Sequence, residues 1–208
     1  LHRGRSGRNK REKYERDKSS RCKFTVPWGA RQPRRIVQGA TYHVMARANR
    51  REFILSLSIV KAMFIAILVR ARSKFDFTIV NICIMENHFH LMIRPGDGES
   101  LSRIMQWVLS CFALRFNRHY GIHGHVWYDR FKSFVVGSLR QFQRTFAYIS
   151  QNPVRAGLAA TARDYKYNGL AFIRDGPRHV VDPPTDVVRL LFPNFTCPQL
   201  YRPPSGQQ

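Results

Sequence analysis

The sequence predicts an α+β fold in which long helices pack on a sheet that is at least partly antiparallel. Strand-like and helix-like segments alternate from residue 41 to residue 151, which is the order expected when helices pack against a sheet. Two of the strand-like segments, 77–85 and 88–93, are separated only by Glu86 and Asn87. So short a connection joins antiparallel strands, so these segments are expected to form a hairpin.

The strand segments are identified by their residue types and by their spacing. Residues 77–85 are rich in β-branched side chains, and residues 88–93 alternate with the period of two that a strand shows. The segment 41–47, TYHVMAR, is also predicted to be a strand, and 126–136 to contain one or two more.

Three segments have the spacing or the end signals of helices. Residues 57–72 carry apolar side chains at helical spacing, Ser100 is placed to cap a helix that runs to about residue 119, and residues 139–151 form the last strong helix. This last helix is expected to end near Pro153 and Gly157, because a residue that precedes proline is disfavoured in the helical region.

Both ends of the chain differ in composition from this central region. Residues 1–36 contain 13 Lys and Arg against three acidic residues, with few apolar positions, so they are predicted to form a disordered basic arm. Residues 176–208 are punctuated by proline and are predicted to be an extended tail with one short helix at 186–192. The folded domain is therefore expected to span residues 37–175.

The charge of the chain indicates a polyanionic partner. Its 35 Lys and Arg residues against 13 Asp and Glu give a formal net charge of +22, a field that attracts nucleic acid. A membrane partner is not expected, because no basic amphipathic anchor is present and the longest apolar run, 62–69, is too short to span a bilayer. The four scattered cysteines favour a reduced, cytoplasmic compartment.

His88 and His90 are the first candidates for a functional site. On a strand, side chains two residues apart point to the same face, so both imidazoles project side by side while Phe89 points to the other face. Two neutral imidazoles can begin a metal site, and the alternative is an ordinary polar strand face. A second pair, His123 and His125, lies in a glycine-flanked loop with no further ligand and is not expected to bind metal.

Tyr148 and Asn152 are the second pair of candidates. They are four residues apart and share one face if the helix extends to Asn152. An amide oxygen on that face can be a third metal ligand beside the two histidines. The alternative interpretation makes Tyr148 a core aromatic residue and Asn152 part of the turn that ends the helix.

Four segments together resemble a known family. They are YHVMARANRR at 42–51, MENHFHLMI at 85–93, RFKSFVV at 130–136 and YISQNPVRAGL at 148–158. In these segments the sequence resembles the IS200-type tyrosine transposases, and most closely their REP-associated branch, over roughly residues 40–172. One departure is Ala48, where the family usually has glycine.

The resemblance implies a ferredoxin-like antiparallel sheet with helices packed on it and an HUH nuclease site. His88 and His90 fall on the family's metal-binding pair, Asn152 on the position of the third ligand, and Tyr148 on the nucleophile. The implied reaction cleaves and rejoins single-stranded or hairpin DNA through a covalent 5′-phosphotyrosine, in a bacterial, nucleoid-associated setting. Nitrogen and oxygen ligands without thiolate favour Mg²⁺ or Mn²⁺ as the cofactor.

Basic and polar residues in these segments are the predicted DNA contacts. They are Arg47, Asn49, Arg50, Arg51, Arg130, Lys132 and Arg155. Trp127 and Tyr128 are candidates for stacking on unpaired bases, although burial of at least one is expected. His43, which lies in the first strand, is either a plain strand residue or one that supports the metal ligands or contacts phosphate.

Two other functions fit the same residues. A DNA-binding protein of this fold that has lost its chemistry would bind DNA without cleaving it. A metal hydrolase that activates water at the two histidines would not need Tyr148. The sequence also leaves open whether the chain is a monomer or a homodimer.

Overall fold

Four strands form one antiparallel sheet in the computed structural model, which describes residues 36–175, 180–183 and 186–191. They are β1 (Thr41–Arg47), β2 (Phe77–Ile84), β3 (His88–Pro95) and β4 (Lys132–Val136). The sheet order is β2-β3-β1-β4, and every neighbouring pair is antiparallel. With one helix after β1 and another after β3, this is the ferredoxin-like arrangement, so the predicted α+β fold is confirmed.

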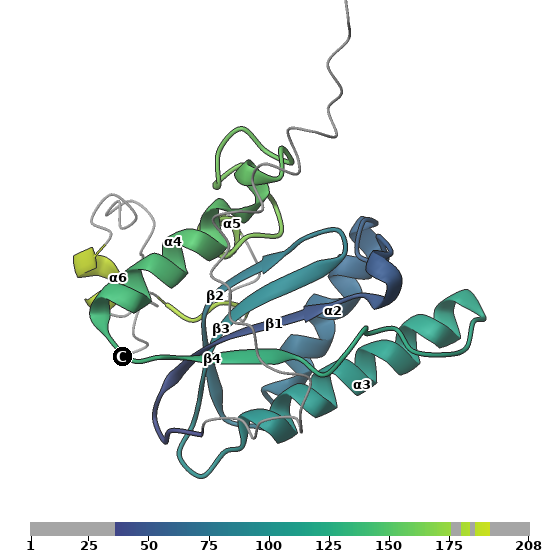
Figure 1. Cartoon of the computed structure of the whole chain (residues 1–208), viewed down its shortest axis with the longest axis horizontal. Coiled ribbons are helices and arrows are strands. Elements are labelled where there is room, and N and C mark those ends of the chain that lie inside the picture. The colour runs from purple at the N-terminus through teal and green to yellow at the C-terminus, as the bar shows by residue number, and fades with distance from the viewer. Residues whose placement is uncertain (1–35, 176–179, 184–185, 192–208) are drawn as a thin grey trace, which may run out of the picture. The chain divides into compact units, whose positions relative to one another are not determined.

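Two helices, α2 (Ser58–Ala71) and α3 (Leu101–Tyr120), lie against one face of the sheet, as Figure 1 shows. Every second strand side chain points to this face, where Val44 and Phe89 are fully buried. Phe64 of α2 packs on Phe89 with their ring centroids 4.6 Å apart. Because this core holds one face of β1 and β3, their intervening side chains point to the opposite face.

The opposite face is covered by α4 (Leu139–Arg155). Ser138 caps the first turn of this helix by accepting a hydrogen bond from the Gln141 N–H. The apolar side of the helix enters a second buried cluster, which includes Met92 of β3 and Phe146 of α4. This packing positions α4 over the strands that carry the candidate histidines.

The helix α4 ends at Arg155, near Pro153 and Gly157 as expected, and it includes Pro153, which lies beyond the predicted range 139–151. Proline removes only its own N–H bond, and beyond it the Ala156 N–H still donates to the Asn152 carbonyl. Pro153 is also buried, so its packing offsets the missing bond. As a result Tyr148 and Asn152 belong to one continuous helix, one turn apart.

The segment 126–136 contains one strand, which agrees with the prediction of one or two. Only β4 is a strand there, while Trp127 forms an isolated bridge with Ala48. The Trp127 indole N–H donates to the Leu109 carbonyl, and its ring packs against the core. After β1 the chain makes a short 3₁₀ turn, η2 (Asn49–Arg51), before α2.

The chain after α4 adds two further helices. The helix α5 (Gly169–Asp175) was not predicted, whereas α6 (Asp186–Leu191) matches the short helix expected at 186–192. Val180 and Val181 are buried in the main core, although they were assigned to an extended tail. The basic arm predicted for residues 1–36 lies almost wholly outside the described residues. Of the helices that the structure describes, none is long and apolar enough to cross a bilayer.

Candidate active site

Three histidines and the candidate nucleophile gather on the face of the sheet that α4 covers. Met45 of β1 lies opposite His90 of β3, and His43 is diagonal to it on the same face. His88 and His90 have ring centroids 5.0 Å apart, as their spacing along one strand predicts. The pairing of β1 with β3 adds His43 to this group.

His90 is the central residue of the group. Its Nδ1 lies 3.0 Å from His43 Nε2, so one of these two nitrogens donates a hydrogen bond to the other. Its Nε2 is buried and has no hydrogen-bond partner among the described residues. A buried polar atom without a partner raises the free energy of the fold, which makes His90 Nε2 the atom here that a ligand would stabilise most.

His88 is oriented by its neighbour in the chain. Its Nδ1 lies 2.7 Å from Asn87 Oδ1. Because a carbonyl oxygen only accepts, Nδ1 carries the proton and Nε2 keeps its lone pair. Metal-binding histidines usually have this environment, with one ring nitrogen donating to an oxygen and the other presenting its lone pair.

Burial keeps all three imidazoles neutral at pH 7. It lowers the pKa of His43 to about 4, and burial together with the nearby charge of Arg47 lowers the pKa of His88 to about 4. The pKa of His90 falls to about 2, because burial is reinforced by His88, His43 and Arg47. Only the neutral form of an imidazole can bind a metal ion, so the site favours the form that coordination needs.

Tyr148 reaches the histidines from α4. Its ring centroid lies 5.4 Å from that of His90 and 6.0 Å from that of His43, in edge-on contacts. The side chain is 40% exposed, so its phenol is accessible from solvent. Arg155, two turns further along α4, places its guanidinium carbon 5.8 Å from the centroid of the Tyr148 ring.

A buried polar network fixes α4 in this position. The Asn81 amide, on β2, donates to the Phe146 carbonyl and to Ser150 Oγ, and the Asn168 amide donates to the Ser150 carbonyl. Asn81, Ser150 and Asn168 are all buried. These bonds bracket Tyr148 along the helix and therefore determine where its ring lies over the sheet.

The residues present fit a metal ion in their chemistry. Among the residues that the structure describes, no three His, Cys, Asp or Glu side chains are grouped to hold a metal, and the candidate third ligand, Asn152, is of another type. Asn152 lies one turn beyond Tyr148, and its amide N–H donates to the Tyr148 carbonyl, a bond that leaves Oδ1 unused. The unpartnered His90 Nε2, the lone pair of His88 Nε2 and this amide oxygen are hard or intermediate donors that suit Mg²⁺ or Mn²⁺.

A basic groove of about 440 Å³ lies beside the histidines. It contains five of the seven residues that the sequence predicted to contact DNA. Its charged and aromatic lining consists of Arg47, Arg50, Arg51, Tyr128, Asp129, Arg130 and Lys132. Tyr128 is 73% exposed, unlike the partly buried Trp127, so only Tyr128 presents a free ring to the groove.

The remaining two predicted DNA contacts lie outside this lining. Arg155 is on α4 beside Tyr148. Asn49 turns its side chain toward the backbone, where Oδ1 accepts a hydrogen bond from the Arg50 N–H. Arg50 and Arg51 adopt positive φ angles of 48° and 59°, a left-handed conformation that non-glycine residues rarely adopt and that directs this turn into the groove wall.

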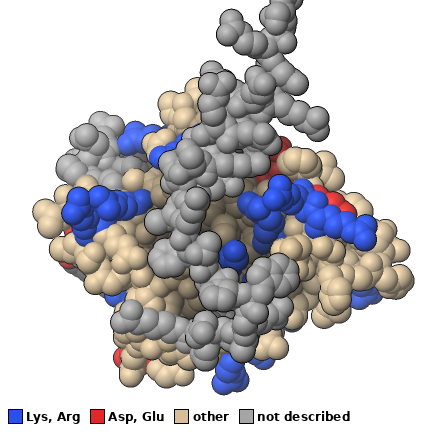
Figure 2. Space-filling model, viewed as in Figure 1, with Lys and Arg blue, Asp and Glu red and all other residues tan. Residues whose placement is uncertain are grey.

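The surface charge matches the composition of the chain. Figure 2 shows Lys and Arg side chains of the described residues in several blue groups on the face in view, with little red from Asp and Glu. A polyanion that approaches this face meets mostly positive charge.

The family of the chain follows from a family model for IS200-like transposases, which matches residues 36–152. This range is more than half of the chain and includes every element from β1 to the part of α4 that carries Tyr148 and Asn152. The chain belongs to the IS200-like transposase family. It is therefore a DNA nicking and joining enzyme of the tyrosine transposase class, as the four sequence segments indicated.

Two solved structures resemble this transposase. A REP-associated tyrosine transposase bound to a REP hairpin aligns with a TM-score of 0.62 and 18% identity, covering 86% of this chain and 98% of that chain. A putative transposase from Deinococcus radiodurans R1 aligns with a TM-score of 0.42 and 16% identity, covering 59% of this chain and 97% of that chain. The first of these likenesses supports the fold. No curated protein matches the chain.

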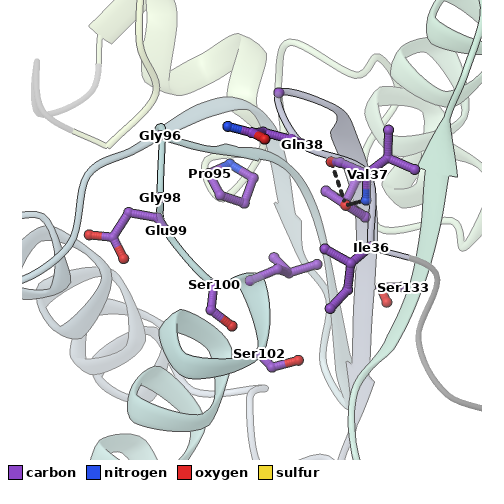
Figure 3. Close-up of a pocket in the computed structure, with 13 residues that line it drawn as sticks. Ile36, Val37, Gln38, Pro95, Gly96, Gly98, Glu99, Ser100, Ser102 and Ser133 are labelled. Atoms are coloured by element: carbon purple, nitrogen blue, oxygen red, sulfur yellow. Dashed lines mark hydrogen bonds between the residues drawn. The ribbon is translucent and has the colours of Figure 1, made fainter.

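The transposase has a second cavity, of about 290 Å³, on the other side of the sheet (Figure 3). It lies between the segment before β1 and the start of α3, and its lining includes Val37, Glu99 and Ser133. The Tyr42 hydroxyl closes it on one side by accepting from the Val37 N–H and donating to the Val37 carbonyl. None of the predicted site residues lines this cavity.

Sequence reasoning did not identify several residues that shape the site of the transposase. Asn87, which orients His88, immediately precedes the histidine pair, so its position next to a predicted strand was the available signal. Asn81 and Asn168 bond α4 from segments far away in the chain, and nothing in the sequence links them to it. Phe134 lies near His43 because β4 pairs with β1, a pairing that the sequence did not reveal.

Proposed function

We propose that this transposase is a metal-dependent single-strand DNA endonuclease and strand transferase with Tyr148 as its nucleophile. The observation that carries the proposal is the position of the Tyr148 ring, 5.4 Å from that of His90, whose buried Nε2 has no partner among the described residues. A nucleophile beside such an atom is the arrangement that a metal-assisted attack on phosphate requires.

Tyr148 carries out the covalent step. Its phenolic oxygen attacks the scissile phosphorus, the bond from phosphorus to the departing 3′ oxygen breaks, and the phenol loses its proton. The products are a 5′-phosphotyrosine and a free 3′-hydroxyl. Because the phosphotyrosine is still a phosphodiester, a 3′-hydroxyl can later attack it and restore both the DNA strand and Tyr148.

His88 Nε2, His90 Nε2 and Asn152 Oδ1 are the proposed ligands of the cation. When it is bound, Mg²⁺ or Mn²⁺ supplies positive charge that stabilises the negative charge developing at the scissile phosphate. His43 supports this set by bonding to His90 Nδ1, and Asn87 does the same for His88 Nδ1. The two hydrogen bonds fix the direction in which the ring nitrogens of His88 and His90 point.

The basic groove is the proposed path of the DNA backbone. Arg47, Arg50, Arg51, Arg130 and Lys132 line it next to the histidines. Single-stranded or hairpin DNA is the proposed substrate, and a REP hairpin is bound in the similar structure. Such DNA would be met at the bacterial nucleoid. Phosphate contacts in this groove would supply affinity and register, while specificity would need contacts to bases.

The direct test compares the protein with its Tyr148→Phe variant. Both are incubated with labelled hairpin oligonucleotides and Mn²⁺, and the products are separated on denaturing gels. We expect a protein–DNA adduct that requires both Tyr148 and the metal, and that does not form when EDTA is present from the start. Cleavage that survives in Tyr148→Phe would indicate metal-activated water, and tight binding without cleavage would indicate a repurposed DNA-binding protein.

The metal ligands need a separate comparison. His88→Ala should abolish the adduct, while a variant with both His123 and His125 replaced by alanine should form it normally, since these two exposed loop residues lie outside the site. Light scattering on the same samples, with and without DNA, distinguishes a monomer from a homodimer.

A further inference from the structure

Phe134 presents an exposed aromatic ring beside the candidate active site. It lies on β4, opposite His43 of β1, and the paired side chains point to the same face of the sheet. The ring centroids of Phe134 and His43 are 6.3 Å apart, and the side chain of Phe134 is 55% exposed. The proposed mechanism gives this ring no role.

The position of Phe134 separates it from the scattered apolar side chains that any protein surface carries. Its neighbour His43 is itself 6.0 Å from the Tyr148 ring, so the three rings form a continuous row that leads from the edge of the sheet to the nucleophile. Because β4 is an edge strand with no partner beyond it in the described sheet, one side of Phe134 borders open solvent.

The charges around Phe134 identify what would cover it. Lys132 is two residues earlier on the same strand and therefore on the same face, and it lines the basic groove together with Arg47 and Arg130. A flat apolar ring at the end of a row of cations suits an unpaired nucleobase, whose phosphates meet the cations while the base stacks on the ring. An apolar protein surface would leave the cations without counter-charge.

We propose that Phe134 is a stacking platform for the base of a nucleotide adjacent to the scissile phosphate. This inference rests on the proposed function, since it takes Tyr148 as the point of attack. The ring centroids along the row are 6.3 Å apart from Phe134 to His43 and 6.0 Å apart from His43 to Tyr148, so a base on Phe134 would belong to a nucleotide at or next to the phosphate that meets Tyr148. Stacking there would hold the scissile phosphate in line with the phenol, so Phe134 would act as a positioning residue.

The first experiment measures adduct formation by Phe134→Ala on intact and abasic DNA. The probe is the hairpin oligonucleotide that gives the most adduct with the unmodified protein, and each nucleotide next to the cleaved bond is replaced in turn by an abasic site. We expect Phe134→Ala to slow adduct formation on intact DNA by roughly 5- to 150-fold, the range of base–aromatic stacking. On DNA that is abasic at the stacked position the variant and the unmodified protein should react at similar rates.

Other substitutions separate aromatic stacking from packing. Phe134→Tyr keeps an aromatic face and should restore most of the rate, whereas Phe134→Leu keeps the apolar volume and should not. Leu114→Ala is the matched control, because Leu114 is 73% exposed on α3, which covers the other face of the sheet. All variants should unfold at the temperature of the unmodified protein.

A second readout does not depend on cleavage. The Tyr148→Phe protein is titrated into a hairpin that carries one 2-aminopurine in its single-stranded flank. If the cleavage experiment gave no adduct to identify a suitable hairpin, one with oligo-dT flanks is used in its place. Binding should quench 2-aminopurine at one flank position, and Phe134→Ala should remove that quenching. If Phe134→Ala removes the quenching but the protein with Tyr148 forms no adduct, the proposal that Tyr148 is the nucleophile fails. The proposal that Phe134 stacks on a base then still stands.

Two results would overturn the proposal. If Phe134→Ala slows intact and abasic substrates equally, the ring acts through His43 and not on a base. If Phe134→Ala changes neither the rate nor the quenching, no base stacks there. If the unmodified protein forms a dimer or a protein complex and Phe134→Ala does not, the ring belongs to a protein interface.

Discussion

His43 Nε2 and His90 Nδ1 lie 3.0 Å apart and join the two central strands of the sheet by a side-chain hydrogen bond. The bond fixes the plane of the His90 ring and therefore the direction of its Nε2, which is buried and has no partner among the described residues. For Nε2 to keep a lone pair, His90 must carry its proton on Nδ1 and donate to His43. When His43 Nε2 is the acceptor of this bond, His90 has the tautomer that a metal ion would need.

The loss of this bond should weaken metal binding without abolishing the fold. His43→Ala is expected to reduce Mn²⁺ affinity and adduct formation by roughly 10- to 100-fold, the usual effect of removing a residue that orients a metal ligand. Mn²⁺ affinity is measured by calorimetric titration of the protein alone. His43→Gln retains a side-chain acceptor and should recover part of the affinity.

His119→Ala is the control for this prediction, because His119 is exposed at the end of α3 on the other face of the sheet. An unchanged Mn²⁺ affinity in His43→Ala would show that His90 is oriented without its partner. A loss of adduct with unchanged Mn²⁺ affinity would instead place His43 in contact with DNA.

The basic groove leads to a prediction about salt. Lys132 lines the groove, and if it contacts one phosphate then Lys132→Gln should lower the slope of log affinity against log salt by about 0.7 for single-stranded DNA. Fluorescence anisotropy at a series of NaCl concentrations measures this slope. Lys74→Gln removes the same charge from an exposed position after α2 and should change the slope much less. Equal slopes for both variants would contradict a phosphate contact at Lys132.

The arrangement of site residues within a single strand could be predicted from the sequence. The arrangement of residues on different strands, which depends on how the strands pair, could not. The alternation of residues 88–93 was sufficient to place His88 and His90 on one face. The bond from His43 to His90 depends on the register of β1 against β3, which non-local contacts determine. For the same reason Phe134 beside His43 was not expected.

The extent of α4 shows a second limit. The local rule that disfavours the helical region before proline would place Asn152 at the end of the helix, but Pro153 is buried and the helix continues through it to Arg155. The positive φ angles of Arg50 and Arg51 also contradict local preference, since non-glycine residues avoid this region. In each case the tertiary setting, which is a buried core for Pro153 and the basic groove for Arg50 and Arg51, goes with a departure from the preference of the single residue.

The reactivity of Cys83 should report whether the sheet beneath the candidate active site stays covered by α4. It lies on β2 directly opposite His90 and is fully buried, and burial raises the pKa of its thiol to about 12. Since only the thiolate reacts, and a raised pKa lowers the thiolate fraction at pH 8, we expect iodoacetamide to leave Cys83 unmodified in the native protein while it modifies the partly exposed Cys111. Mass spectrometry of digested peptides measures both.

Modification of Cys83 at the rate of Cys111 would contradict this expectation and would mean that β2 and α4 separate in solution. Addition of Mn²⁺ should then slow the modification if the metal holds the two elements together. The denatured protein supplies the reference rate for both thiols.

Asn81, which holds α4 in position, packs so closely against Gly169 that no side chain fits there. A Cβ at this residue would lie 2.2 Å from Asn81 Oδ1 and 3.1 Å from the Ile82 nitrogen. Asn81 cannot turn away cheaply, because Oδ1 accepts from the Ile82 N–H while its amide bonds Phe146 and Ser150 of α4. Gly169→Ala is therefore expected to destabilise the protein by about 1–3 kcal/mol, the usual cost of overpacking.

The sign of this effect is informative, because replacing a helical glycine by alanine at an unobstructed site normally stabilises a protein by about 0.5–1 kcal/mol. Gly137→Ala, at a position before α4, is the control for steric room, since the nearest atom to its added Cβ is Gln141 Oε1 at 3.9 Å. Urea denaturation measures both free energies of unfolding. Because Ser150 follows Tyr148 on α4, a shift of Asn81 should also slow adduct formation in Gly169→Ala under conditions where the variant is folded. Neutral or increased stability in Gly169→Ala would mean that Asn81 moves freely and that its bonds do not hold α4 in place.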